Sequence, residues 1–534
     1  MKIDIIHPAH YRDDGTLVQS KNWVDRLGAY LPHLGPPLMA ALTPDKHEVR
    51  LTEEYLADVD FESDADVVAL SGQIMQLQRC VDISKRFRAA GKKVVLGGYL
   101  PSMLPERVEN LFDAIVIGEG DEVWPQILDD IEHGRLQSRY RSARPPDINN
   151  LPIPRYDLIK KDRVVVYPVQ ATRGCPFTCE YCSIAAVYNG MYRKRPVDQI
   201  VRDVEATRSK NINFCDDNLC EDVKFADRLF TALNGAPIRW GTQTTINVAR
   251  HPELLKKARE SGCVLMALGV ETFSARNLED VNKTFHSVDK YAEGFRRIMD
   301  AGISPHALII FGLPDDNAET FKRTVDYLES LKVPITQFFI LTPYPGSPTG
   351  DKIWRSGSVF DTNLNHLREP YVVFKPQQLS PAELHDGWWH AVEEFYSLRS
   401  ILKRVVFRRK PLNLWVNLAT NLYYWSKVKR GIIRCTSGRT ETCVFVERVL
   451  AQRRKGAKQA AKGATALFNC FPLRLCGFAR ESFWLSNDVP CGISAAKRST
   501  QHTRIVSGNM ATGASLQSTG PTRARSRRRG DAVL

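Results

Sequence analysis

Short apolar segments alternate with amphipathic segments along the first 150 residues. The longer segments between them carry apolar residues at helical spacing. Such alternation predicts parallel strands joined by crossover helices, which cover both faces of one sheet. The expected strands are Lys2 to His7, Glu48 to Thr52, Val67 to Ser71, Lys93 to Leu96 and Ala114 to Ile117.

Small residues follow several of these expected strands. In an open parallel sheet, ligands bind beyond the carboxyl ends of the strands, and glycine there lets a flat ligand approach the backbone. The pattern suits a flavin, a nucleotide or a corrin. Residues 1–150 are therefore expected to form a doubly wound ligand-binding domain. The candidate binding residues are Ser71, Gly72, Gly97, Gly98, Gly118, Glu119 and Gly120.

The alternation of strand and helix resumes in residues 160–375, where it predicts a partial (β/α) barrel. A helical segment is expected over residues 376–426, and it begins with the capping box Ser380 to Glu383. An apolar stripe in this segment is expected to pack against the barrel, although its aromatic residues could instead line a pocket for a hydrophobic substrate. The stripe is made of Leu384, Trp388, Val392, Phe395, Leu398 and Leu402, with Trp389 and Tyr396 beside it.

The net charge of +14 is distributed unevenly along the 534 residues. Residues 427–534 hold 21 Lys and Arg but 5 Asp and Glu, so residues 1–426 carry a net charge of −2. We interpret residues 427–534 as a basic, disordered tail. The composition changes abruptly near Lys427, so a tail that is not native coding sequence is an open alternative. Binding of RNA or of an acidic surface by this tail is the alternative, and nucleic acid is not the expected partner.

No apolar run approaches the length of about 20 residues that a membrane span requires. The start of the chain reads as a strand and not as a signal peptide, so the expected location is the cytoplasm. The basic and then aromatic character of residues 399–425 permits weak membrane contact. Twelve cysteines in such a chain favour metal binding or free thiols over disulfides.

Cys175, Cys179 and Cys182 lie within eight residues, directly after the apolar run Val164 to Val169. Three thiolates on one loop can hold three corners of an iron–sulfur cube and leave the fourth iron open to a small molecule. A structural zinc site is the alternative, but it needs four ligands, and no further Cys or His is close in sequence. Cys215 and Cys220 could form a second cluster or a catalytic thiol, or they could be inert buried cysteines.

The spacing C-x3-C-x2-C, with an aromatic residue before the last cysteine, closely resembles the cluster loop of the radical S-adenosylmethionine (SAM) superfamily. The resemblance implies a [4Fe-4S] cluster whose open iron binds the amino and carboxylate groups of SAM. One electron then cleaves SAM to methionine and a 5′-deoxyadenosyl radical. By the same resemblance, Tyr181 is expected to lie against the adenine.

Polar or small residues at the ends of the later strands are the candidate SAM contacts, because active-site groups of such barrels lie there. Paired carboxylates could meet the amino group of SAM, a Glu-Thr pair suits a ribose hydroxyl, and a glycine brings bare backbone to the adenine side. Each acidic residue could instead be a helix cap or a solvated turn. In that order the candidates are Asp216 and Asp217, Glu271 and Thr272, and Gly312, with Gln243 as a neutral polar group at another strand end.

The order of the first-domain segments, ahead of a radical SAM loop, resembles the cobalamin-binding domain of B12-dependent radical SAM proteins. Pro36-Pro37-Leu38, Val95 to Gly98 and Ile117 to Glu122 carry this resemblance. There is no D-x-H-x-x-G run to supply an axial histidine, and His7 and His10 are more typical of loop residues, so the lower face of cobalt is expected to lack histidine. A domain that kept the fold and lost the cofactor is the alternative.

The combined resemblance implies a cobalamin-dependent radical SAM methyltransferase acting on an unactivated carbon of a small-molecule or lipid-like substrate. The adenosyl radical would remove a hydrogen, and methylcobalamin would deliver the methyl group. An external donor of the flavodoxin or ferredoxin type would supply electrons. A B12-dependent cyclase or ring-rearranging enzyme and a cobalamin or redox sensor remain alternatives. Methylthiolation of tRNA is disfavoured, because those enzymes carry three more cluster cysteines where this chain has only Cys80.

Overall fold

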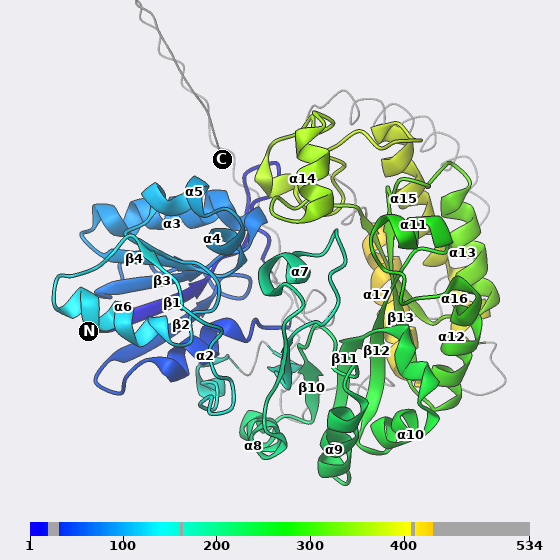
Figure 1. Ribbon diagram of the computed structural model, residues 1–534, viewed down its shortest axis with the longest axis horizontal. Coiled ribbons are helices and arrows are strands. Elements are labelled where there is room, and N and C mark those ends of the chain that lie inside the picture. Colours follow the sequence, from blue (N-terminus) through cyan, green and yellow to red (C-terminus); the bar gives the residue numbers. More distant parts are fainter. Residues whose placement is uncertain (20–30, 161–163, 407–411, 431–534) are drawn as a thin grey trace, which may run out of the picture. The chain divides into compact units, whose positions relative to one another are not determined.

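The computed structural model describes residues 1–19, 31–160, 164–406 and 412–430 (Figure 1). All of them belong to the unit Met1–Trp484, and the second unit, Leu485–Leu534, lies outside the described residues. Two separate six-stranded sheets follow one another along the chain, and a group of helices comes after them. The expected fold class is confirmed: a doubly wound parallel sheet, a partial (β/α) barrel and a C-terminal helical segment.

The first sheet is parallel throughout, with the strand order β2-β1-β3-β4-β5-β6. Five of its strands lie where the sequence predicted them, and β6 was not expected. Because all strands run the same way, their carboxyl ends meet at one edge. The strands are β1 (Lys2–His7), β2 (Glu48–Glu53), β3 (Val67–Ser71), β4 (Lys93–Gly97), β5 (Ala114–Val116) and β6 (Arg139–Tyr140).

Helices cover both faces of the first sheet (Figure 1). Alternate residues of each strand point to opposite faces, so Ile3 and Ile5 pack in one core with Trp124, whereas Ile6 packs in the other with Phe87. The helices are α2 (Gly35–Leu42) and α6 (Val123–Glu132) on one side, and α3 (Leu77–Ala89), α4 (Tyr99–Met103) and α5 (Pro105–Val108) on the other.

The second sheet is also parallel, with the order β14-β13-β12-β11-β10-β7, and it forms the partial barrel. Helices pack on its outer face, as expected for a (β/α) barrel. The strands are β7 (Tyr167–Val169), β10 (Asn211–Phe214), β11 (Arg239–Thr244), β12 (Cys263–Glu271), β13 (Ser304–Phe311) and β14 (Ile335–Ile340). The helices are α8 (Val197–Thr207), α9 (Val223–Leu233), α10 (Pro252–Glu260), α11 (Ala275–Asp280), α12 (Tyr291–Asp300) and α13 (Thr320–Ser330), and α14 (Pro348–Arg355), which follows β14, packs in a separate apolar cluster.

A small hairpin interrupts this repeat directly after β7. It consists of β8 (Thr172–Gly174) and β9 (Tyr192–Lys194), which pair antiparallel, with α7 (Ser183–Tyr188) between them. Gly174 has φ +82°, and a side chain there would meet the backbone oxygen of Met191. Only glycine therefore lets the two strands of the hairpin approach so closely at the start of the three-cysteine loop.

The inner face of the barrel sheet keeps solvent access. On β12, Met266, Leu268 and Val270 are fully buried against the helices, whereas Leu265, Ala267 and Gly269 between them are partly exposed. The same alternation continues on β13 and β14, with partly exposed residues His306, Leu308, Gln337 and Phe339. Outward residues thus build the core, and inward residues line an accessible space.

The C-terminal segment packs against the barrel through the first part of the expected stripe. Leu384, Trp388, Val392 and Phe395 on α15 (Pro381–Phe395) are buried, and the capping box at Ser380 is present. The helix ends at Phe395, however, so Leu398 and Leu402 are exposed by 44% each. The prediction of one continuous packing stripe was therefore wrong at its end. Trp389 and Tyr396 are also buried, which makes them core residues.

Arg404 holds the remaining C-terminal elements together. Its guanidinium is fully buried and donates to the carbonyls of Val333, Pro334 and Phe395 and to Oδ1 of Asn421, at 2.6 to 3.1 Å. Burial lowers its pKa to about 10. The elements around it are α16 (Leu398–Ile401), a π-helical turn (Leu402–Val406) and α17 (Leu414–Lys429).

The expected tail begins inside the last turn of α17, and residues 431–534 lie outside the described residues. Among the helices that the structure describes, none is long and apolar enough to cross a lipid bilayer. α17 contains Trp415, exposed by 45%, within the segment for which weak membrane contact was expected. That contact stays a prediction.

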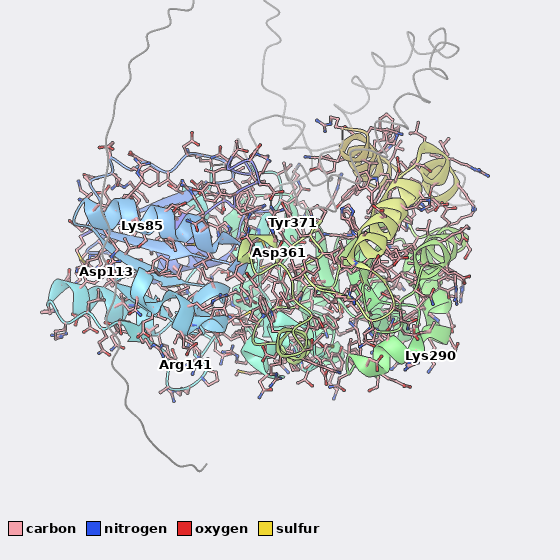
Figure 2. All side chains as sticks on the ribbon, turned by 90° about the horizontal axis from the view of Figure 1, so that it is seen from above. Lys85, Asp113, Arg141, Lys290, Asp361 and Tyr371 are labelled. Atoms are coloured by element: carbon pink, nitrogen blue, oxygen red, sulfur yellow. The ribbon has the colours of Figure 1, made fainter. Side chains whose placement is uncertain are left out.

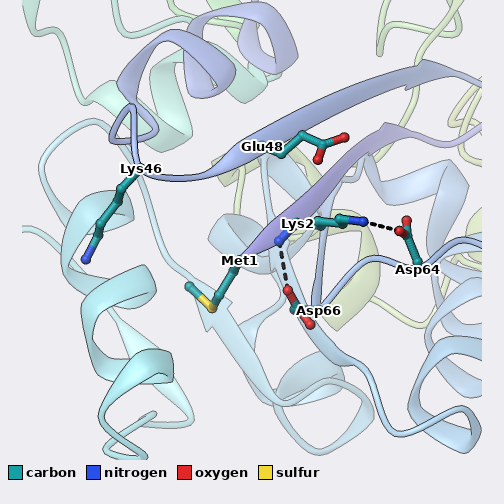
Figure 3. A pocket seen from close by; sticks show the side chains of 6 residues that line it. All are labelled: Met1, Lys2, Lys46, Glu48, Asp64 and Asp66. Atoms are coloured by element: carbon teal, nitrogen blue, oxygen red, sulfur yellow. Dashed lines mark hydrogen bonds and ion pairs between the residues drawn. The ribbon is translucent and has the colours of Figure 1, made fainter.

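A shallow hollow at the amino ends of β1 and β2 is lined by charged side chains (Figure 3). Lys2 contacts two of them: its Nζ pairs with Asp64, and its backbone N–H donates to Asp66 at 2.8 Å. These residues are at the opposite edge of the sheet from the glycine-rich strand ends. The hollow is therefore separate from the candidate site. It is lined by Met1, Lys2, Lys46, Glu48, Asp64 and Asp66.

Candidate functional site

The three-cysteine loop is fixed by the segments that follow β12 and β14. The backbone N–H of Glu180 donates to the carbonyl of Val281 at 3.1 Å, and the N–H of Thr349 donates to the carbonyl of Glu180 at 3.0 Å. The ring of Phe177 stacks on that of Phe285, with centroids 3.6 Å apart. The loop thus has its conformation set by contacts that are distant in sequence.

The three thiols lie in a partly enclosed environment. Cys179 is buried, and Cys175 and Cys182 are partly exposed. Burial raises the pKa of all three thiols, that of Cys179 to about 11. A bound iron would reverse this shift, because a coordinating thiol is deprotonated outright.

The arrangement of the three thiols distinguishes a site for a single metal ion from a site for a cluster. Within the described residues, no three His, Cys, Asp or Glu side chains converge closely enough to hold one ion. A [4Fe-4S] cluster does not require such convergence, since each thiolate binds a different iron. Three thiols on one partly exposed loop therefore fit a cluster with one open iron. Cys175, Cys179 and Cys182 are the residues that would hold it.

Asp216 and Asp217 follow β10 but face different groups. Asp216 is buried and accepts hydrogen bonds from the backbone N–H groups of Ala171 and Thr172 and from the Thr172 hydroxyl at 2.7 Å. Asp217 accepts one bond, from the N–H of Gly174 at 3.2 Å, and is partly exposed. Asp216 thus positions the start of the hairpin, and Asp217 is the carboxylate that remains accessible beside the three-cysteine loop.

Burial raises the pKa of both carboxyl groups, that of Asp216 to about 7 and that of Asp217 to about 6. The hydrogen bonds that each accepts oppose this shift, because they favour the ionised form. A cationic amino group placed beside Asp217 would stabilise its charge further. Asp217, as the accessible member of the pair, therefore suits a positively charged ligand group.

Glu271 forms a buried ion pair that the sequence did not predict. Its Oε1 accepts from Lys283 Nζ at 2.7 Å, and Lys283 also donates to the Tyr181 hydroxyl at 3.2 Å. Burial alone would lower the pKa of Lys283, but Glu271 and the thiols of Cys179 and Cys182 raise it above its ordinary value. A permanent positive charge thus lies next to the three-cysteine loop.

A bulge in β12 aims Glu271 at this position. The pairing of β12 with β13 shifts register between Gly269 and Glu271, and Glu271 has φ +68°. A left-handed backbone costs about 1–3 kcal/mol for a residue other than glycine, and such strain clusters at functional sites. A side chain at Gly269 would come within 2.7 Å of the Glu271 carboxylate. Glycine at 269 therefore makes room for the turned-back glutamate.

Three other predicted contacts have different surroundings from those expected. Gly312 has φ +95°, its N–H donates to Asp316 at 2.8 Å, and a side chain there would meet Leu384 of α15. Thr272 is buried, and its hydroxyl accepts from the N–H of Ser274. Gln243 lies within β11 and not after it, with its side chain exposed. Gly312 is thus constrained mainly by packing, whereas Gln243 is accessible on the sheet.

The glycine-rich strand ends of the first sheet meet at its carboxyl edge, as expected for consecutive parallel strands. Ser71 pairs with Gly97 across β3 and β4. A side chain at Gly98, which has φ +97°, would come within 2.7 Å of the Gly72 carbonyl, so these two loops touch through bare backbone. Gly118 has φ +82° with open space beyond it, and Gly120 lies against Met39. The edge is therefore a surface made mainly of main chain.

Glu119 is the one charged candidate at this edge, and its carboxylate is already paired. Its Oε2 lies 2.5 Å from Arg173 Nη1, and its Oε1 lies 2.5 Å from Arg193 Nη2. Asp121 pairs with Arg173 as well, at 2.8 Å. We call Glu119, Asp121, Arg173 and Arg193 the Arg173 ion cluster. It connects the loop after β5 to both strands of the β8–β9 hairpin.

The first-domain histidines near this edge are mostly engaged with the protein. His7 is buried, and its Nδ1 lies 3.0 Å from the Ser71 carbonyl. His10 Nδ1 lies 2.7 Å from the Tyr55 hydroxyl. Burial lowers the pKa of both rings, that of His10 to about 3. Both histidines are thus neutral, and His7 is the last residue of β1, whereas His10 lies in the loop after it.

Comparison with known families identifies the larger class. A family model for the Radical SAM superfamily matches residues 169–328, which run from the end of β7 into α13 and include the three-cysteine loop. The chain therefore contains a radical SAM domain. A domain of this kind implies a [4Fe-4S] cluster and SAM as cofactors, and the assignment of single residues to them stays a prediction.

Two curated relatives extend well beyond the radical SAM domain. Bacteriochlorophyllide d C-12(1)-methyltransferase of Chlorobaculum tepidum is 27% identical over 417 residues, which are 75% of this chain and 90% of that protein. Hopanoid C-2 methylase of Rhodopseudomonas palustris is 28% identical, over 76% of this chain and 78% of that protein. The chain is thus a radical SAM enzyme whose relatives are named as methyltransferases.

The arrangement of both sheets recurs in a solved structure. The radical SAM methyltransferase TsrM from Kitasatospora setae, solved with cobalamin and a [4Fe-4S] cluster bound, has a TM-score of 0.58 to this chain. The match covers 81% of this chain and 99% of that one at 14% identity. At this identity the likeness shows the fold alone.

Sequence reasoning missed several side chains around the radical SAM site. Lys283 lies in a loop after α11, and no local pattern marks it. Arg173 lies two positions before the first cysteine of the C-x3-C-x2-C motif, and its basic character there was its only signal. Tyr99 follows Gly98, and its pKa is raised by burial with contributions from Tyr188, Asp217 and Cys182. These residues come together only through the tertiary fold.

Proposed function

We propose that the protein is a cobalamin-dependent radical SAM methyltransferase that acts on an unactivated carbon of a small-molecule or lipid-like substrate. The observation that carries the proposal is the joining of the three-cysteine loop to the glycine-lined edge of the first sheet within one unit. When bound, the cluster would supply the electron that cleaves SAM, and cobalamin would supply the methyl group. The named activities of the two curated relatives support this choice.

The residues around the three-cysteine loop fit the charges of SAM. Asp217 would accept hydrogen bonds from the amino group, and Tyr181 would lie against the adenine. Lys283 would face the carboxylate, while Glu271, released from part of its pairing, would accept from a ribose hydroxyl. Without the ligand, Lys283 and Glu271 satisfy each other, which avoids an unpaired buried charge.

The main-chain edge of the first sheet fits a corrin. Gly97, Gly98 and Gly118 present backbone without side chains, so a broad flat ring can lie against the strand ends. Ser71 would offer a hydroxyl at the same edge. The Gly118 loop would contribute its backbone, because the side chain of Glu119 is held by two arginines.

The inner face of the barrel supports a largely apolar substrate. Leu265, Ala267, Leu308 and Phe339 are partly exposed there, and among the described polar atoms Nε2 of His306 has no hydrogen-bond partner. Burial lowers the pKa of His306 to about 4, so the ring is neutral. This lining would hold a ring system or lipid with few polar groups.

The proposal also requires partners outside the chain. An external flavodoxin- or ferredoxin-like donor would deliver electrons to the cluster. A reducing compartment such as the cytoplasm would protect the thiols. We do not propose nucleic acid as a partner, and residues 427–430 are assigned no such role. Membrane contact through the segment around Trp415 would be weak.

The test is anaerobic purification with cobalamin supplied, followed by absorbance spectra and product analysis with methyl-labelled SAM and candidate substrates. We expect iron and corrin in the preparation, 5′-deoxyadenosine, S-adenosylhomocysteine, and the label in a new product. 5′-Deoxyadenosine without S-adenosylhomocysteine would instead indicate a cyclase or rearranging enzyme. Absence of 5′-deoxyadenosine under reducing conditions would contradict an enzyme of this type and favour a sensor.

A further inference from the structure

The Arg173 ion cluster is unusual in its geometry as well as in its place. Arg173 makes a two-pronged contact with Asp121, Nη1 to Oδ2 at 2.8 Å and Nη2 to Oδ1 at 3.1 Å. Glu119 gives one carboxylate oxygen to Arg173 and the other to Arg193, each at 2.5 Å. Planar guanidinium and carboxylate groups that pair in this way fix orientation as well as distance.

These four side chains are largely withdrawn from solvent. Arg173 is exposed by 7%, Asp121 by 10%, Glu119 by 12% and Arg193 by 18%. Two cations and two anions balance, so no net charge is buried. Charges held in this way are poor contributors to stability, because desolvation offsets their attraction. Their burial therefore points to a requirement for geometry and not to a gain in folding energy.

The cluster acts on the three-cysteine loop through one intervening residue. Gly174 follows Arg173 and precedes Cys175, and its pairing with Tyr192 in the β8–β9 hairpin limits its independent movement. Arg173 is also tied to Gln170 at 3.2 Å. A displacement of the Arg173 guanidinium would thus be passed directly to the first cysteine.

On the other side, the cluster fixes the loop after β5. Glu119 lies between Gly118 and Gly120, a sequence that alone would allow many conformations. The N–H of Gly118 is held by the Ser102 hydroxyl at 2.9 Å, and the side chains of Glu119 and Asp121 are held by the hairpin. The loop that would support the corrin is therefore positioned by residues of the radical SAM domain.

Several other contacts join the first domain to later parts of the chain, and two of them serve as comparison. Helix α4, which begins at Tyr99, packs against α7 of the hairpin. The hydroxyl of Tyr371, labelled in Figure 2, donates to Asp13 at 2.5 Å. Neither of these two contacts involves a charged side chain that is close in sequence to one of the three cysteines. The Arg173 ion cluster is thus the contact that most directly couples the two edges.

We propose that Glu119, Asp121, Arg173 and Arg193 are positioning residues that hold the two cofactor-bearing loops in one fixed relation. The inference rests on the proposed function, because a methyl donor and an adenosyl radical must reach the same substrate carbon. Misplacement of reacting groups by about 1 Å costs on the order of 100-fold in rate. Buried, oriented ion pairs supply a fixed spacing of this kind, which flexible glycine loops alone would not.

The test uses the full chain loaded with iron, sulfide and cobalamin, and it compares Glu119→Gln and Arg193→Lys with wild type. Each preparation is assayed for iron and corrin content and for the ratio of 5′-deoxyadenosine to methylated product. The enhancement of cob(II)alamin spin relaxation by the reduced cluster, measured by electron paramagnetic resonance, reports their separation without turnover. Arg139→Gln is the matched control, because it removes an exposed ion pair between Arg139, on β6, and Glu109.

We expect both variants to keep iron and corrin and to raise the ratio of 5′-deoxyadenosine to methylated product about tenfold or more. The spin relaxation of cob(II)alamin should also change in both, while Arg139→Gln matches wild type. Arg193→Lys keeps the charge and loses only the planar fork, so it decides the question if Glu119→Gln does not fold. A wild-type ratio and wild-type relaxation in Arg193→Lys, with both cofactors bound, would overturn the inference. A wild-type protein without corrin would instead refute the proposed function.

Discussion

The carboxyl edges of the two sheets are built from different parts of the chain. The first edge is made of backbone, with Gly97, Gly98 and Gly118 at consecutive strand ends and few free charges. The barrel edge is made of side chains, and it includes the buried pair Glu271–Lys283 and the carboxyl group of Asp217, whose pKa is raised by burial. Both edges belong to parallel sheets, so topology does not account for the difference.

The difference follows from what each edge would have to bind. A corrin is broad and rigid and needs room and shape, which main chain without side chains can give. SAM and an iron–sulfur cluster are small and charged, and they need oriented charges in a partly desolvated site. The two edges should therefore fail independently. Substitutions at each edge test this separation.

The largest effect is expected from replacing Cys175, Cys179 and Cys182 together by alanine. Three thiolates are the only protein ligands proposed for the cluster, so iron content and formation of 5′-deoxyadenosine should both fall to background. Corrin binding should persist, because the first edge is unchanged. Cys263→Ala, at a buried cysteine in β12, is the control and should keep its iron. Iron retained by the triple variant would contradict the proposed site.

A smaller effect is expected from the double substitution Glu271→Gln/Lys283→Met. Removing both charges avoids leaving one unpaired in the interior, so folding should be preserved better than in either single variant. Loss of hydrogen bonds to charged groups, about 1.5–3 kcal/mol, should raise the SAM concentration for half-maximal cleavage about 10- to 100-fold.

The control for this pair is Lys322→Met, which removes an exposed ion pair with Asp326 on α13. It should leave SAM cleavage unchanged. An unaltered dependence on SAM in the double variant would show that Lys283 serves only the packing of the three-cysteine loop.

Gly98→Ala tests the first edge. A side chain there would clash with the Gly72 carbonyl in a left-handed backbone, so the strand ends must separate. We expect corrin occupancy to fall about tenfold or more while the iron content stays at the wild-type level, with strain of about 1–3 kcal/mol. Gly91→Ala is the control, because Gly91 also has a positive φ but open space around it. It shows the effect of backbone strain without a steric clash at the proposed corrin surface. Equal corrin loss in both would argue against the proposed corrin surface.

The smallest effect concerns pH and again distinguishes the barrel edge. Burial raises the pKa of Asp316, which accepts from the N–H groups of Gly312 and Leu313, to about 6. Because the folded pKa lies above the unfolded value, the unfolded chain ionises first, and stability falls as pH rises from about 4 to 6. Asp316→Asn should flatten this fall by a few degrees in melting temperature. A melting curve with the wild-type pH dependence would contradict it.

The sequence predicted the strands whose burial follows their apolar pattern. β1 and β3 have the bounds expected, because each carries apolar residues that are buried on both faces of the sheet. β6 was not predicted because it has two residues, Arg139 and Tyr140, and only one of them is buried. The helical stripe was extended too far past Phe395, since periodicity alone does not reveal where a helix ends.

The candidate site was predicted where its chemistry is local in sequence. The spacing of three cysteines on one loop is enough to predict a cluster site. Lys283, by contrast, approaches Tyr181 only because the loop after α11 folds back over the three-cysteine loop. The role of Asp216 was also beyond sequence reasoning, because an acidic residue after a strand does not reveal whether backbone N–H groups will surround it. Glu119 was expected at the corrin edge, and its partners come from a different sheet.

The shell of carbonyls around Arg404 sets a practical boundary for shortening the chain. One member of that shell is Asn421 on α17, and Val428, near the end of the helix, is buried against the barrel core. A truncation placed at residue 426, where the composition changes, would cut the final turn and remove Val428. A protein that ends at Arg430 keeps the carbonyl and amide oxygens that accept hydrogen bonds from Arg404. Any loss of function in this shortened protein can therefore be attributed to the residues removed.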